Sequence, residues 1–164
     1  MGQAGGLDEM QASYARIQGM PWVNTLAADR TGRCWYIDAS ATPNLSSDAQ
    51  QRFRDRLEQD LVAALLYENR VPLLNGSDPG DDWLDDPDAR RPGVVGHPRL
   101  PQLERRDVVV NANDSHWLTN PAEPLEGYSV FHGFERTPRS LRTRQNLRVA
   151  TALAEAGDVT AEVA

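Results

Sequence analysis

The three histidines of the chain, and the serine that lies beside one of them, are side chains of types that could support hydrolysis. A zinc-activated hydrolase needs ligands at a spacing such as H-x-x-x-H or H-E-x-x-H, and His97, His116 and His132 form neither pattern. Ser115 lies beside His116, but the G-x-S-x-G turn of a serine hydrolase is missing around it. The sequence therefore argues against a metal-activated hydrolase and against a Ser-His-Asp triad.

An acidic stretch could bind a hard cation such as calcium through its carboxylate oxygens. Its spacing does not match an EF-hand loop, and it alternates with proline and with Trp83. We interpret it as an acidic surface loop. Its six aspartates are Asp78, Asp81, Asp82, Asp85, Asp86 and Asp88.

Two asparagines, Asn111 and Asn113, lie one residue apart in the stretch NANDSHW. On an extended chain this spacing places both carboxamides on the same face, where their N–H groups could donate to one ligand. The sequence Asn-Asp-Ser is also good turn chemistry, because an asparagine side chain can accept a hydrogen bond from the backbone two residues later. The residues alone leave a binding role and an Asx-turn open.

The elements that must position these residues are visible in the hydrophobic pattern, and they predict an α+β fold. The run around Asp29-Arg30-Thr31-Gly32 has its glycine last, as suits a hairpin turn between two β-rich segments. Proline, glycine and aspartate crowd a long stretch without periodicity, which indicates an irregular connection. The predicted elements are a helix at 7–18, strands at 20–28 and 33–39, a helix at 48–68 capped within Ser46–Asp48, an irregular connection at 71–103, a strand at 107–111, and a helix from Thr137-Pro138 to Gly157.

Composition and charge limit the function classes. The chain of 164 residues is long enough for one domain with a core, so we expect a single unit over 1–164. Its net charge of -7 argues against nucleic acid as a partner, because phosphate binding needs a basic face. No apolar run reaches the roughly 18 to 20 residues that span a bilayer, and Met1 to Gly6 lack the pattern of a secretory signal. As written, the chain is expected to be cytoplasmic.

Three ordered motifs resemble the penicillin acylase family. Asn111 to Pro121, which reads NANDSHWLTNP, resembles the β-chain segment that carries the family's oxyanion-hole asparagine. The stretch from Gly19 to Asp38 is similar to the family's hairpin, and Glu135 to Arg144 is similar to the segment after the asparagine. Residues 7 to 150 are therefore collinear with the family, and in particular with its aculeacin and acyl-homoserine-lactone acylase branch.

The resemblance implies an N-terminal-nucleophile hydrolase with an αββα sandwich, of which this chain would be an incomplete part of the β-chain. Such enzymes hydrolyse linear amides, as in the acyl side chains of β-lactams, in lipopeptides or in acyl-homoserine lactones. By the resemblance, Asn113 would be the oxyanion donor, with Asn111 as the second candidate. Arg136 or Arg139 would be the active-site arginine. No organic cofactor is implied; some family members bind calcium, but their ligands do not map onto this sequence.

The nucleophile is the part of the resemblance that is missing. Nothing before Gly19 resembles the family's processed N-terminal serine, and the turn residues around Gly76-Ser77 do not resemble a self-cleavage junction. We therefore expect the chain to be inactive alone and to need the remainder of the acylase chains as its partner. Full-length family members are usually periplasmic or secreted. The alternative hypothesis is a non-catalytic module that binds a partner through an incomplete sheet edge.

Overall fold

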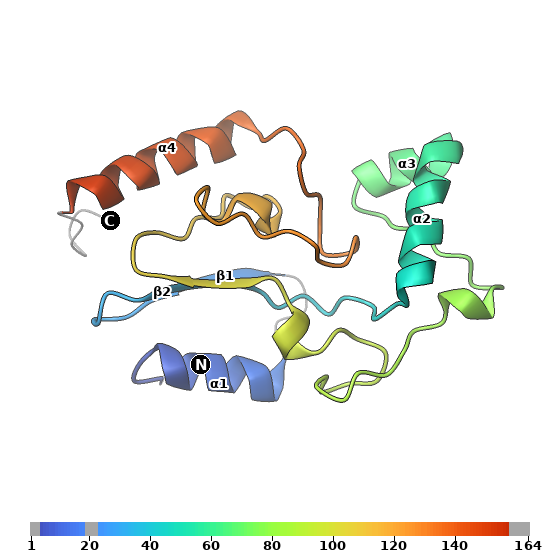
Figure 1. Ribbon diagram of the computed structural model, residues 1–164, viewed down its shortest axis with the longest axis horizontal. Helices are drawn as coiled ribbons and strands as arrows, with labels where there is room; N and C mark the ends of the chain where they lie inside the picture. Colours follow the sequence, from blue (N-terminus) through green and yellow to red (C-terminus); the bar gives the residue numbers. More distant parts are fainter. Residues whose placement is uncertain (1–3, 19–22, 158–164) are drawn as a thin grey trace.

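The structure, a computed structural model, describes residues 4–18 and 23–157 and mixes helices with a small sheet (Figure 1). Among the described residues, no helix is long and apolar enough to cross a membrane. The helices and strands are α1 (Leu7–Ile17), β1 (Asn24–Ala28), β2 (Cys34–Asp38), α2 (Ser47–Gln59), α3 (Leu61–Glu68), the 3₁₀ turns η1 (Pro79–Asp81) and η2 (His97–Arg99), β3 (Gln102–Arg105), the 3₁₀ turn η3 (His116–Leu118) and α4 (Leu141–Ala156).

The sheet has three antiparallel strands in the order β1-β2-β3. The predicted hairpin is confirmed over the described residues, and the part of its first strand at 20–22 lies outside them. Its turn forms because the Asp29 carboxylate accepts hydrogen bonds from the amide and the hydroxyl of Thr31, at 2.9 and 2.5 Å. Gly32 then takes a φ of 77°, which favours glycine. Local turn chemistry therefore sets the register of the first two strands.

Alternate residues of β2 face opposite sides of the sheet, as a pleated strand requires. Trp35 and Ile37 pack against α1, where Tyr14 meets Trp35 edge to face with ring centroids 5.3 Å apart. Tyr36 faces the other side and packs with Leu103 of β3. Figure 1 shows α1 on one face of the sheet and the chain that follows β3 on the opposite face. The central strand is thus covered on both faces.

The predicted α+β class is confirmed, and the sandwich is not. The described residues hold a single sheet, with a helix on one face and irregular chain on the other. The second sheet that an αββα arrangement requires is not among them. The two-sheet architecture therefore stays a prediction from the family resemblance.

The single helix predicted at 48–68 is wrong, because Asp60 divides it into α2 and α3. The backbone at Asp60 is extended, with a φ of -120° and a ψ of 101°. Its carboxylate accepts hydrogen bonds from the amides of Val62 and Ala63, which caps the second helix. At the other end the predicted cap is confirmed, since the Ser46 hydroxyl accepts from the amide of Ala49 at 3.1 Å.

The predicted strand at 107–111 is also wrong. The third strand lies earlier, at Gln102–Arg105, where it pairs with β2. Two of the three valines that suggested a strand have other hydrogen-bond partners: the amide of Val110 donates to the carbonyl of Thr119, and the side chain of Asn120 donates to the carbonyl of Val108. The apolar run is therefore held by a loop that folds back on it rather than by a ladder.

The last helix begins three residues later than predicted. Ser140, not Thr137, is the N-cap, and its hydroxyl accepts from the amide of Thr143 at 3.2 Å. The predicted end is confirmed, because Gly157 takes a left-handed φ of 74°. The later start changes which arginines lie on the helix: Arg139 precedes it and Arg142 falls in its first turn.

The irregular connection predicted at 71–103 is largely confirmed, with η1, η2 and the start of β3 as its regular parts. The acidic stretch within it is only partly a surface loop. Asp86 is buried, and its carboxylate accepts from the amide of Gly96 and pairs with Arg99. A Cβ at position 96 would lie 2.5 Å from that carboxylate, so a side chain there would displace Asp86. The buried pair anchors the connection to the rest of the fold.

Candidate functional site

The loop from Asn111 to Ser115 holds the predicted site, and Asn111 organises its turn. The Asn111 carboxamide oxygen accepts from the amide of Asn113 at 2.9 Å, which is an Asx-turn. The Asn111 carboxamide nitrogen donates to the carbonyl of Asp114 at 3.0 Å. Both ends of this side chain are therefore used inside the loop.

Asn113 presents its side chain in a different way. Its φ of 60° is left-handed, so the segment is not extended and the expected same-face placement of the two asparagines does not apply. The residue is exposed, and its carboxamide oxygen accepts from the guanidinium of Arg142 at 2.9 Å. A guanidinium can only donate, so the oxygen must face Arg142. This leaves the Asn113 N–H₂ group without a hydrogen-bond partner among the described residues.

Arg142 is the arginine that contacts Asn113, and it is not one of the two arginines that the family resemblance put forward. It lies in the first turn of α4 and also donates to the carbonyl of Ala112. The two contacts tie the loop to the helix. The signal that could have identified Arg142 was the pattern Ser140-Leu-Arg-Thr, in which a serine cap places the arginine within the first helical turn.

Arg139 lies next to the loop but serves a different set of partners. Only 5% of its side chain is exposed, and one nitrogen contacts the Asp114 carboxylate at 2.8 Å and the Ser115 hydroxyl at 3.1 Å. The other terminal nitrogen donates to the carbonyl of Phe134 at 3.2 Å. The guanidinium also stacks over the Trp117 ring at 4.8 Å. Arg139 therefore joins three segments of the site region.

Arg136 is a surface residue in this structure. Its side chain is 77% exposed and pairs with Glu126, whose other contact is the indole N–H of Trp117 at 2.8 Å. The Arg136 pair and the Trp117 contact lower the pKa of Glu126 to about 2. Arg136 contacts neither of the two asparagines among the described residues. Of the two arginines that the sequence put forward, only Arg139 reaches the loop.

Asp114 is the charged centre of the loop. Its second carboxylate oxygen accepts from the hydroxyl of Thr143 in α4, at 3.1 Å. Burial by itself would raise the pKa of Asp114. The Ser115 amide, the Arg139 charge and the Thr143 hydroxyl outweigh burial, so that the pKa lies below its ordinary value. The carboxylate stays ionised and holds the loop against the start of α4.

Ser115 and His116 are structural rather than nucleophilic here. The Ser115 hydroxyl donates to the carbonyl of Phe134 at 2.5 Å. His116 is fully buried, its Nε2 lies 3.3 Å from Glu135, and burial lowers its pKa. The fold brings His116 within 6.4 Å of His132, ring to ring. Across residues 4–18 and 23–157, no group of three or more His, Cys, Asp or Glu side chains could hold a metal ion.

Comparison with known proteins identifies the family. The penicillin amidase family profile matches residues 1–163. The chain belongs to the penicillin amidase family. This confirms the kinship that the three sequence motifs predicted. The loop from Asn111 to Ser115 lies within the matched region.

Several curated acylases are similar to the chain. The aculeacin-A acylase of Actinoplanes utahensis is 42% identical over 147 residues, which cover 90% of this chain and 18% of the relative. The acyl-homoserine lactone acylase PvdQ of Pseudomonas fluorescens is 41% identical over 152 residues, 92% of this chain and 18% of the relative. PvdQ of Pseudomonas syringae pv. tomato is 36% identical over 163 residues, which cover 99% of this chain and 20% of the relative. The chain thus spans about a fifth of the length of these relatives.

Proposed function

We propose that the chain is the part of a linear-amide acylase that supplies the oxyanion donor, Asn113. The observation that carries the proposal is the orientation of its carboxamide, whose oxygen is held by Arg142 while its N–H₂ group is exposed and unpartnered among the described residues. The similarity to acylases that act on aculeacin A and on acyl-homoserine lactones supports the reaction class. The substrate would be an acyl chain joined to an amine.

In this reaction a serine oxygen forms a bond to the amide carbonyl carbon, and its proton passes to a base, which the family resemblance makes the serine's own α-amine. The carbonyl oxygen becomes negatively charged, and the Asn113 N–H group donates to it. Such a donor lowers the barrier by about 2.7 to 4 kcal/mol. The amine then leaves with a proton, and water releases the acyl group as a carboxylate. The serine would come from another part of the acylase.

Arg142 and Arg139 would have separate roles in this proposal. Arg142 contacts the oxygen of the Asn113 carboxamide, so it would orient the donor and strengthen it by polarising the amide. Arg139 contacts Asp114 and would hold the loop in place without touching the donor. Asn111 is a weaker candidate for the oxyanion donor, because both ends of its carboxamide bind the loop backbone.

The remainder of the acylase is the proposed partner. Three side chains of α3 are strongly exposed although they are apolar: Leu61 at 74%, Val62 at 64% and Leu65 at 50%. The sheet also ends in two edge strands, β1 and β3, within the described residues. Apolar patches and open edges of this kind are normally covered. Since the relatives are about five times as long, the rest of such a chain would cover them.

A chimera tests the donor assignment. This chain would replace the corresponding segment of the Actinoplanes utahensis acylase, and hydrolysis of a chromogenic acyl anilide would be measured. We expect Asn113→Ala to lower kcat by about 10² to 10³ with little change in KM, because the lost hydrogen bond forms in the transition state. Asn146→Ala is the matched control, since Asn146 is exposed on α4 and has no hydrogen-bond partner among the described residues.

The chain expressed alone is expected to release no chromophore, because it would lack the serine. Turnover by the isolated chain would contradict this part of the proposal. A folded but inactive chimera would instead support the non-catalytic binding module. An active chimera whose kcat survives Asn113→Ala would remove Asn113 from the oxyanion role.

A further inference from the structure

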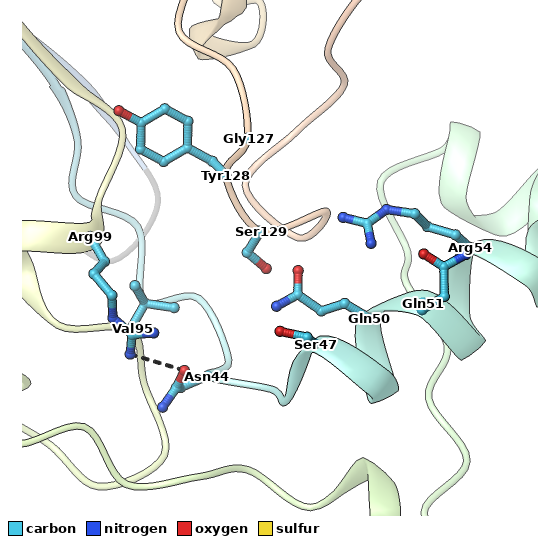
Figure 2. Close-up of a pocket in the computed structure, with 10 residues that line it drawn as sticks. All are labelled: Asn44, Ser47, Gln50, Gln51, Arg54, Val95, Arg99, Gly127, Tyr128 and Ser129. Atoms are coloured by element: carbon cyan, nitrogen blue, oxygen red, sulfur yellow. Dashed lines mark hydrogen bonds between the residues drawn. The ribbon is translucent and has the colours of Figure 1, made fainter.

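A cavity lies away from the Asn113 loop, against the first two turns of α2. Its volume is about 530 Å³, which falls within the range of small-molecule sites. Its walls come from Asn44 and the start of α2, from the chain at Val95 to Arg99, and from the loop at Gly127 to Ser129. Figure 2 shows these three segments around one open space.

The lining of the cavity is polar and carries no carboxylate. Ser47, Gln50 and Arg54 lie three and four residues apart on α2, so they share one face of the helix. Gln51 and Ser129 add an amide and a hydroxyl. In Figure 2 the Gln50 carboxamide and the Ser129 hydroxyl face each other, and Arg54 extends from the helix toward the same loop.

The two arginines of the cavity differ in their charge balance. Arg99 pairs with the buried carboxylate of Asp86 and donates to Asn44 at 3.1 Å, so its charge is already matched. Arg54 makes no hydrogen bond or ion pair with any described residue, and its side chain is exposed. The chain as a whole carries a net charge of -7. An unpaired guanidinium therefore lies in a cavity that has no carboxylate among its lining residues.

Several neutral groups of the cavity also keep unused hydrogen-bonding capacity. The Gln50 nitrogen donates to the carbonyl of Leu45 at 3.2 Å, and the Gln51 nitrogen donates to Asp55 at 2.8 Å. Both carboxamide oxygens therefore remain free to accept a hydrogen bond, since neither has a partner among the described residues. The hydroxyl of Ser47 has no partner among the described residues. Amide oxygens that accept and hydroxyls that donate and accept are complementary to the hydroxyl groups of a ligand.

We propose that this cavity binds a small hydroxylated anion, whose charged group pairs with Arg54 and whose hydroxyls contact Gln50, Gln51 and Ser47. The charged group can be a carboxylate, as in a sugar acid, or a phosphate, as in a sugar phosphate. Both offer the oxygen pair that a guanidinium binds with two parallel hydrogen bonds. The site is separate from the Asn113 loop and does not depend on amide hydrolysis.

Titration of the 164-residue chain by ¹H–¹⁵N NMR tests this inference, with gluconate, glucose 6-phosphate, glucose and acetate as probes. We expect saturable shifts at the Gln50 and Gln51 side-chain amides with at least one of the two hydroxylated anions, with a Kd of about 1 mM or below. Whichever of gluconate and glucose 6-phosphate binds more tightly shows whether the site prefers a carboxylate or a phosphate. Glucose lacks the charge and acetate lacks the hydroxyls, so each should bind at least about tenfold more weakly.

Two variants separate the contributions. Arg54→Gln should raise the Kd of the preferred anion by about tenfold or more. Arg148→Gln, which changes an exposed arginine of α4, should leave the Kd unchanged. Gln50→Leu should weaken the binding of gluconate or glucose 6-phosphate and leave the binding of acetate unchanged. The proposal is overturned if neither hydroxylated anion saturates, if glucose binds as well as they do, or if Arg54→Gln binds like the parent chain. Far-UV circular dichroism confirms that each variant is folded.

Discussion

The sheet with α1 and the site region at 107–143 are stabilised by different interactions. Ladders of backbone hydrogen bonds join the three strands, and apolar side chains such as Trp35 and Ile37 fill the space beneath α1. The site region has isolated backbone hydrogen bonds and is joined by buried polar side chains, with Arg139 at their centre. A ladder tolerates the loss of one side chain's charge, whereas a network built around one guanidinium does not. The site's geometry therefore depends on a few ionised groups.

Removing the largest side chain of the sheet core should have the largest effect on stability. Trp35 is 1% exposed, so Trp35→Ala leaves a large cavity between the sheet and α1. We expect the free energy of unfolding to fall by about 4 kcal/mol. Urea denaturation measures it, with Leu26→Ala as the control because Leu26 on β1 is 44% exposed. A loss below about 1 kcal/mol would mean that this core does not hold the sheet.

Arg139→Ala should have the second-largest effect and lower the free energy of unfolding by about 3 kcal/mol. The substitution leaves Asp114 without its cation, and the cost is at the low end for a buried pair because 20% of the Asp114 side chain is exposed. Hydrogen exchange should show the loss in 107–143 and leave the amides of β1 and β2 protected.

Arg136→Ala is the matched control for Arg139→Ala. The side chain of Arg136 is 77% exposed, so the free energy of unfolding should fall by less than about 1 kcal/mol. Equal losses for the two variants, or exchange that increases first in the sheet, would contradict the difference between the two regions.

The buried histidines should make stability depend on pH. Burial lowers the pKa of His132 from 6.5 to about 4, although Asp38 and Glu135 oppose the shift. The folded state therefore binds fewer protons than the unfolded state between these values. Stability should fall as pH decreases through this window, by up to about 1.4 kcal/mol per pH unit. Asp114, whose pKa is lowered, loses its contribution only at lower pH, as pH falls through its folded pKa.

Urea denaturation between pH 7 and pH 4 measures this slope. His132→Gln should reduce it, because the glutamine does not titrate. Trp35→Ala should lower stability at every pH and keep the slope, since it changes only the apolar core. An unchanged slope in His132→Gln would assign the pH dependence to other groups.

Local signals predicted the sheet region well. The three- and four-residue spacing of apolar side chains gave α1, and the Asp29-to-Gly32 turn gave the hairpin, because both depend on residues close in sequence. The break at Asp60 was also a local signal, an aspartate that caps the helix after it, but the apolar pattern continues across it. The third strand could not be found from pattern, since Gln102–Arg105 has a single apolar residue and is defined by pairing with β2.

The arrangement of the candidate site could be predicted from the sequence only in part. The motif identified the loop and named Asn113, and the turn chemistry weighed for its asparagines is present at Asn111. Which arginine meets Asn113 depends on where α4 begins and how it packs on the loop, and this is tertiary information. Because α4 begins at Leu141, after the Ser140 cap, Arg142 lies beside Asn113 and Arg139 pairs with Asp114. The cavity beside Arg54 is lined by three segments that are distant in sequence, so no local sequence pattern predicts it.

The central claim is that Arg142 holds Asn113 as an oxyanion donor, and a double-mutant cycle on kcat of the acylase chimera tests it most directly. The cycle compares Asn113→Ala, Arg142→Met and the double variant, with Arg148→Met as the control. We expect Asn113→Ala to lower kcat by about 10² to 10³ and Arg142→Met by about tenfold, with no further loss when both are combined. If the two losses multiply, Arg142 acts independently of Asn113 and the claim is wrong.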